Sequence, residues 1–215
     1  MNEKLANFIL DHSTNISTLD VTDVNCKWLI NHHRFDVSFK NLYNLRCNFI
    51  NGHEFFDKIA NICRNIQSLD VCMYVDSKYL YTDQIDRSLT NLIKAQKQIE
   101  WLSIRSDKKL FFSDDFKEAL LIHSKSITRY CSRGGNNIDS MLIPKFTNLN
   151  WLTLSGDDSN LAEILRSGLF RDNKRITILF FNSPLLLDLS NFIKINGKTL
   201  SSLAIYCGRL SVCEN

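Results

Sequence analysis

The hexapeptide Leu149-Asn150-Trp151-Leu152-Thr153-Leu154 has apolar residues at its first, fourth and sixth positions. The fourth and sixth residues are two apart, so both point to one face of an extended strand, while the first enters the same core from the preceding turn. The pattern recurs as Ile16-Leu19-Val21, Leu42-Leu45-Cys47, Ile66-Leu69-Val71, Ile99-Leu102-Ile104, Ile127-Tyr130-Ser132, Ile176-Leu179-Phe181 and Leu200-Leu203-Ile205. Because one such unit cannot bury its apolar face alone, the repeat predicts a stack of about eight units.

The spacers between these motifs carry the signals of returning helices. Polar residues that can cap a helix precede apolar residues at helical spacing. This pattern starts at Thr82-Asp83 (Ile85, Leu89, Leu92 and Ile93), Ser113-Asp114 (Phe116, Ala119, Leu120 and Ile122) and Asp158-Ser159-Asn160 (Leu161, Ile164, Leu165 and Leu169), and it also covers residues 54–65. The spacer at 138–147 contains Pro144 and predicts at most a brief helix or turn.

Strand and helix in alternation predict one α/β domain over residues 1–215. We expect a curved solenoid with parallel strands on the concave face and helices on the convex face. Residues 1–15 precede the first motif and are expected to form an N-terminal cap or a partial repeat.

Composition and charge indicate which kinds of partner to expect and in which cellular compartment. The formal net charge is only +3, which gives no reason to expect a nucleic-acid partner. No apolar run is long enough to span a membrane, and the first residues lack the apolar stretch of a secretory signal. The seven cysteines are scattered without a C-x-x-C motif, which is typical of reduced thiols in a protein of the cytoplasm or nucleus.

The motifs at 149–154, 200–205 and 66–71 resemble leucine-rich repeats, and the spacer 89–97 is similar to those of fungal-type F-box and leucine-rich-repeat proteins. The resemblance covers the chain from about Ile16 to Ile205. It implies the substrate-recognition subunit of an SCF ubiquitin ligase, in which the repeats hold a protein destined for ubiquitination and an F-box binds the adaptor Skp1. Residues 1–15 contain no F-box, so Skp1 binding is expected only if an F-box lies outside this chain.

The repeat pattern also predicts where a protein partner binds. Residues at the second, fourth and sixth positions after each motif start should face the concave surface. Trp, Tyr and Arg dominate the hot spots of protein interfaces, so a patch rich in them is the expected partner site. We predict that it consists of Trp101, Arg105, Arg129, Arg133, Trp151, Ile178, Phe180 and Tyr206. The alternative is that the aromatic residues shield strand edges or pack on C-terminal residues such as Leu210 and Val212.

No pattern of catalytic residues is found, and no enzymatic activity, cofactor or metal is expected. His32-His33 is the only histidine pair. If these two residues lie in a strand they point to opposite faces, which predicts no metal site. Besides the ligase adaptor, two functions remain open: a scaffold or inhibitor with no ligase role, and a regulator of a small GTPase that supplies Arg105 or Arg133.

Overall fold

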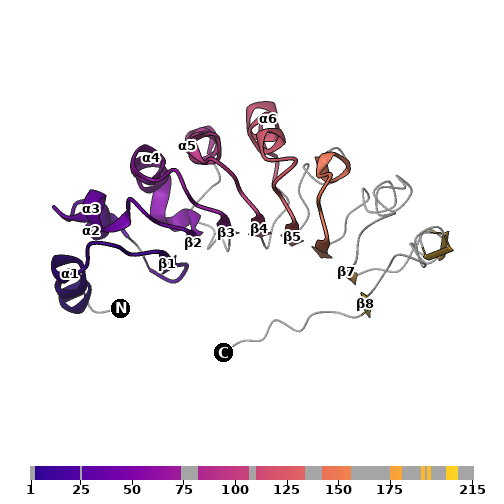
Figure 1. Cartoon of the computed structure of the whole chain (residues 1–215), viewed down its shortest axis with the longest axis horizontal. Helices are drawn as coiled ribbons and strands as arrows, with labels where there is room; N and C mark the ends of the chain where they lie inside the picture. Colours follow the sequence, from indigo (N-terminus) through magenta and orange to yellow (C-terminus); the bar gives the residue numbers. More distant parts are fainter. Residues whose placement is uncertain are drawn as a thin grey trace.

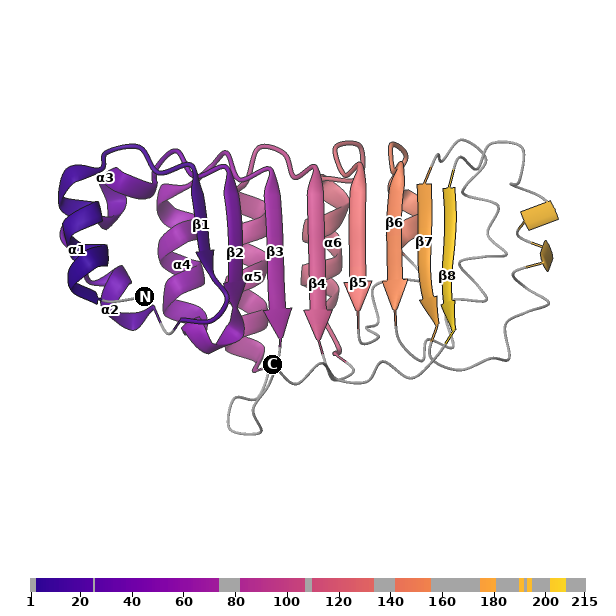
Figure 2. The ribbon, with the colours of Figure 1, turned by 90° about the horizontal axis from the view of Figure 1, so that it is seen from below.

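A single sheet of parallel strands runs through the molecule. The computed structural model describes residues 3–24, 26–73, 82–106, 110–133, 142–155, 175–180, 190–191, 193–194 and 202–207. In chain order the described strands are β1 (Thr18–Val21), β2 (Asn44–Asn48), β3 (Ser68–Met73), β4 (Trp101–Ser106), β5 (Arg129–Arg133), β6 (Trp151–Ser155), β7 (Arg175–Phe180) and β8 (Ser202–Cys207). From β2 onward, each strand pairs with the strand before it, so the order of the strands in the sheet is their order in the chain (Figure 2). The expected α/β class with parallel strands is confirmed.

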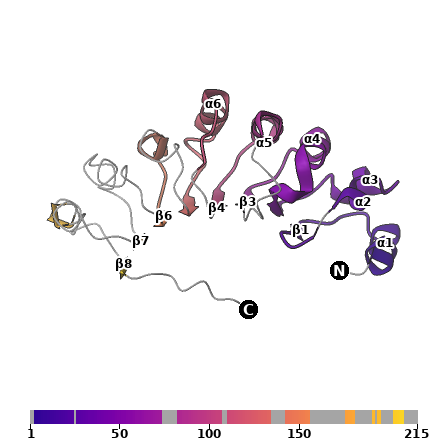
Figure 3. The ribbon, with the colours of Figure 1, turned by 180° about the vertical axis from the view of Figure 1, so that it is seen from behind.

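Helices cover one face of this sheet. The described helical segments are α1 (Glu3–His12), α2 (Lys27–Ile30), α3 (Phe35–Phe39), η1 (Phe49–Asn51), α4 (Gly52–Ile62), α5 (Asp83–Ala95), α6 (Asp114–Ile122) and η2 (Ile143–Lys145). Figures 1 and 3 show α4, α5 and α6 on the outer side of a curved sheet, with the other face of the strands on the inner, concave side. The brief turn expected near Pro144 is η2, and α1 occupies the predicted N-terminal cap. The helix predicted after Asp158 lies outside the described residues.

One column of residues in register crosses all the strands. Pairing of the strands brings into register Leu19, Leu45, Leu69, Leu102, Tyr130, Leu152, Ile176 and Leu203. From Leu19 to Leu152 these side chains are buried, with exposed fractions of 8% or less. Burial of a side chain of this size stabilises the fold by about 1.5–3 kcal/mol. From β1 to β6 the column therefore joins each unit of the stack to its neighbours.

The predicted register of the seventh motif is wrong. Ile176, and not Leu179, aligns with Leu152 and Leu203. The reason is that the segment from Ile176 to Phe181 is apolar except for Thr177, so apolar residues fall on both faces of the strand and the two frames, which differ by three residues, are not separated by alternation. An odd shift exchanges the two faces of a strand. Leu179 therefore takes the register position of Ser155 and Tyr206.

The helices form where the capping residues predict them. Thr82 accepts a hydrogen bond from the Ile85 N–H at the start of α5, and Ser113 accepts one from Phe116 at the start of α6. The apolar stripe of α5 (Ile85, Leu89, Leu92 and Ile93) is buried, and so are Phe116, Ala119 and Leu120 of α6. Ile122 was expected in the same stripe, but it is 62% exposed, because helical spacing from Phe116 places the buried His123, and not Ile122, on the inner face.

Buried polar side chains link consecutive units behind the sheet. Asn51 accepts a hydrogen bond from Cys26 N–H at 3.0 Å and donates one to the Val21 carbonyl at 3.1 Å. Gln96 donates to the carbonyls of Cys63 and Leu92 and accepts from the Ile66 N–H. Each such bond contributes about 1 kcal/mol, and leaving a buried donor unpaired costs more. These residues therefore fix the register of the stack as well as its stability.

Candidate functional site

Two tryptophans and an arginine stand in one row on the concave face. Trp101, Arg129 and Trp151 are the first residues of β4, β5 and β6 and lie in register. Trp101 is 42% exposed and Trp151 39%. The Arg129 guanidinium lies 5.7 Å from the centre of the Trp151 ring, and the indole N–H of Trp151 donates to Thr153 Oγ1 at 3.1 Å. The row is therefore an ordered surface in which an aromatic face is already paired with a cation.

A shallow groove of about 250 Å³ begins at this row and continues toward β2. It is lined by Tyr43, Asn44, Gln67, Ser68, Glu100, Trp101, Thr128 and Arg129. Tyr43 is 43% exposed and was not among the predicted binding residues. It lies one residue before its strand, outside the alternation on which the prediction was based. We call this groove together with Trp151 the strand-start groove.

The main chain holds the strand starts in a fixed order. The Gln67 carbonyl accepts hydrogen bonds from the N–H groups of both Glu100 and Trp101. The Glu100 carbonyl accepts from Thr128 and Arg129, and the Thr128 carbonyl from Asn150 and Trp151. Because each unit is bonded twice to the one before it, the side chains of the groove are carried on a rigid base. Little conformational entropy then has to be lost when a partner binds.

On the concave face, acidic and basic side chains alternate from β1 to β4 and form a chain of ion pairs, which we call the ladder. The Asp70 carboxylate, 8% exposed, accepts hydrogen bonds from Arg105 at 2.7 and 3.1 Å. Arg46 joins Asp70 at 3.2 Å to Asp20 at 2.8 Å. Burial raises the pKa of Asp20, but hydrogen bonds from Thr22 and the charge of Arg46 outweigh it, so this pKa lies below its usual value. Arg105, predicted to contact a partner, is thus held in the ladder.

The other predicted binding residues are placed by strand register. Arg133 is exposed and lies beside Arg105, and Tyr206 takes the same register row in β8. Ile178 lies in register with Leu154, and Arg175, not Ile178, takes the register position of Trp151. The register row predicted for Ile178 and Phe180 is therefore wrong, because it depended on the shifted frame of the seventh motif. The concave register positions of β7 are those of Arg175, Thr177 and Leu179.

Five cysteines are free thiols in or near the core: Cys26, Cys47, Cys63, Cys72 and Cys131. Burial raises the pKa of Cys26 and of Cys63 to about 12 and that of Cys72 to about 11. At neutral pH these thiols are protonated and poor nucleophiles or metal ligands. They act as small core residues, and Cys63 donates to the Phe39 carbonyl.

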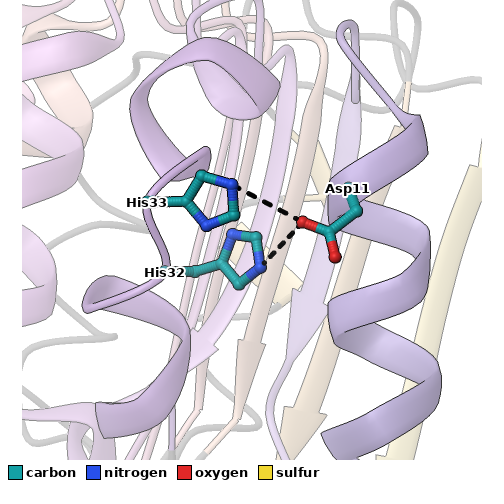
Figure 4. A group of neighbouring side chains, drawn as sticks. All are labelled: Asp11, His32 and His33. Atoms are coloured by element: carbon teal, nitrogen blue, oxygen red, sulfur yellow. Dashed lines mark ion pairs between the residues drawn. The ribbon is translucent and has the colours of Figure 1, made fainter.

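His32 and His33 are not in a strand, so the argument that separated them is wrong. They lie in the turn between α2 and α3, where their rings stack and both face Asp11 of α1 (Figure 4). Sequence spacing gave no signal that joined Asp11 to this pair, because the contact depends on how α1 packs against the turn.

No family model matches the chain, and neither curated proteins nor solved structures give a match to it. Among the described helices, none has the length and apolar character needed to cross a membrane.

Proposed function

We propose that the chain is a leucine-rich-repeat solenoid that binds another protein through its concave face. The observation that carries this proposal is the strand-start groove, in which the exposed Trp101 and Trp151 stand on either side of Arg129 and the exposed Tyr43 lies at the β2 end. Exposed aromatic groups in contact with water have a cost, and a contiguous set of them marks a binding surface. The parallel strands in chain order and the aligned leucine column support the repeat assignment.

The charges favour a partner that brings a carboxylate to an aromatic surface. Among the described residues, no acidic group lies within ion-pair distance of Arg129 or Arg133. The positive charges of the earlier strands are matched within the ladder of Asp20, Arg46, Asp70 and Arg105. Among the described concave side chains, basic groups without an ion-pair partner therefore lie on β5, where Arg129 stands between the two tryptophans. We infer that an acidic segment with an apolar or aromatic anchor docks there.

Within this function, the role we propose is substrate recognition in an F-box-type ubiquitin ligase. This proposal depends on the resemblance of the repeats and spacers to those of such adaptors. The alternative is a scaffold or inhibitor with the same binding face and no ligase role. A role as GTPase regulator finds less support, because Asp70 already engages Arg105. In every case the repeats position another protein, and no catalytic step is assigned to this chain.

The test is a partner-binding measurement with a matched surface control. Partners captured from cell extract are identified, purified and titrated against the wild type and the double variant Trp101→Ala/Trp151→Ala. Because hot-spot residues contribute about 2 kcal/mol or more each, we expect at least a roughly 30-fold loss of affinity. Ile122→Ala removes an exposed apolar side chain from the convex side and should leave affinity unchanged.

Three further outcomes separate the possibilities. Equal affinity of the double variant and the wild type, with circular dichroism showing an intact fold, would exclude the concave face as the binding surface. Co-purification of Skp1 and a cullin with the protein expressed from its natural locus supports the ligase role. Their absence, with partner binding retained, supports the scaffold.

A further inference from the structure

Three metal-ligating side chains from separate elements meet at the N-terminal end of the molecule (Figure 4). Asp11 lies in the last turn of α1, and His32 and His33 in the turn between α2 and α3. Asp11 Oδ1 lies 3.4 Å from His32 Nε2 and 3.7 Å from His33 Nε2. The two imidazole rings stack with centroids 4.6 Å apart. One ligand atom from each residue falls within 4.8 Å of the other two.

We propose that Asp11, His32 and His33 bind a divalent ion of the zinc class. In a tetrahedral site with metal–ligand bonds of 2.0–2.1 Å, neighbouring ligand atoms are about 3.3–3.4 Å apart. The two Asp–His separations are close to this value, so small side-chain rotations bring all three groups onto one ion. Two imidazole nitrogens and a carboxylate suit zinc and its neighbours in the transition series, whereas calcium and magnesium prefer oxygen ligands alone. Water would complete the fourth position.

The ordinary alternative is a hydrogen-bonded cluster without an ion. The Arg34 N–H donates to His32 Nδ1 at 3.2 Å, so the proton of a neutral His32 ring lies on Nε2 and faces Asp11. Metal binding at Nε2 moves this proton to Nδ1 through solvent, and the Arg34 N–H bond is given up. This step costs one long hydrogen bond. Bonds from a dipositive ion to three ligands exceed that cost, since structural zinc sites stabilise their folds by far more.

The ion would attach the terminal helix to the rest of the stack. Among residues 7–12 of α1, Leu10 alone is buried, whereas Phe8 is 60% exposed and Ile9 42%. A bridge from Asp11 to the α2–α3 turn would hold the helix at a second point. The ion is thus expected to stabilise the end of the molecule, and this role is independent of the strand-start groove.

The experiment is a zinc titration of the full chain carrying no polyhistidine tag, after removal of metal with a chelator. Isothermal titration calorimetry should show one ion per chain with a dissociation constant in the micromolar range or below. Thermal unfolding should move to higher temperature as zinc is added. His33→Ala changes a side chain that is 74% exposed, so the fold should survive. Loss of an outer-shell partner of a metal site weakens binding about 10–100-fold, and loss of this ligand should cost at least as much.

The matched control is His12→Ala, which removes the histidine next to Asp11. His12 bonds to the Phe8 carbonyl within its own helix and is not part of the cluster, so zinc affinity should be unchanged. Cobalt(II) provides a second readout, because nitrogen and oxygen ligands give no intense sulfur-to-metal charge-transfer band, whereas cysteine ligands do. Failure to bind zinc in the micromolar range overturns the proposal. Undiminished binding by His33→Ala, or a thiolate band with cobalt, overturns it as well.

Discussion

His123 is a buried ionisable residue whose neutral form the fold requires. It is 2% exposed, and its Nε2 lies 2.9 Å from the Ile93 carbonyl, to which the ring donates. Burial lowers the pKa of His123 from its ordinary value of 6.5, and the hydrogen bond to Ile93 offsets only part of that effect. At the scale of single residues, the stack therefore contains a group that opposes folding in acid.

The sign of the pH effect follows from proton binding in the two states. As pH falls through 6.5, the unfolded chain takes up a proton at His123 before the folded chain does, so stability falls with pH until the folded pKa is reached. We expect the free energy of unfolding to decrease as pH falls through 6.5, and to decrease less in His123→Gln, whose amide can still donate to Ile93. Urea unfolding at several pH values measures the difference. The other histidines are common to both proteins, so parallel pH profiles would contradict the prediction.

Between elements, the start of α6 is tied to the side of α5. Ser113 caps α6 through the Phe116 N–H, and its hydroxyl also donates to the buried Asp86 carboxylate of α5. Asp86 Oδ1 accepts a second bond from the Ser113 N–H at 3.3 Å. Ser113 thus pairs a main-chain donor at the start of α6 and also donates to the Asp86 carboxylate of the preceding helix, α5.

Replacing this cap should cost more than replacing an isolated one. We expect Ser113→Ala to lower the free energy of unfolding by about 2 kcal/mol, the upper part of the range for helix caps, because Asp86 loses a donor as well. Thr82→Ala at the start of α5 is the matched comparison, since Thr82 is exposed and caps only its own helix, and it should cost about 1 kcal/mol or less. Chemical denaturation of both variants gives the two values. Equal losses would show that the link to Asp86 adds nothing.

Elements with strong local signals were predictable, and contacts between elements were not. The helices that start after Thr82 and Ser113 and the leucine column through β4 follow from periodicity and capping. The frame of β7 was missed because both faces of this strand carry apolar residues, and pairing with β6 and β8 selects the register. Tyr43 was missed because it lies one residue before its strand, outside the alternation on which the prediction was based. The Asp11–His32–His33 cluster was missed because it depends on how α1 packs against the turn between α2 and α3. Arg105 was expected to be free for a partner, but the fold turns Asp70 toward it.

Across the whole molecule, each unit contacts chiefly its two neighbours, because the strands pair in chain order. Stability in such a stack is approximately the sum of the units and of the interfaces between them. A unit in the middle contributes to two interfaces, and the unit at the β1 end to one within the sheet. The same substitution should therefore cost more in the middle than at the end.

Leu102→Ala and Leu19→Ala test this expectation with the same change in the same column. Leu102 is fully buried and pairs with Leu69 and Tyr130, whereas Leu19 is 8% exposed and pairs only with Leu45. We expect Leu102→Ala to lower the free energy of unfolding by about 3–5 kcal/mol and Leu19→Ala by about 2–3 kcal/mol, within the range for buried leucines. Denaturant unfolding gives both values, and amide hydrogen exchange locates the loss. In Leu102→Ala faster exchange should reach β3 and β5, but in Leu19→Ala it should stop at β2. Equal losses, with exchange accelerated along the entire sheet in both variants, would instead describe one undivided cooperative unit.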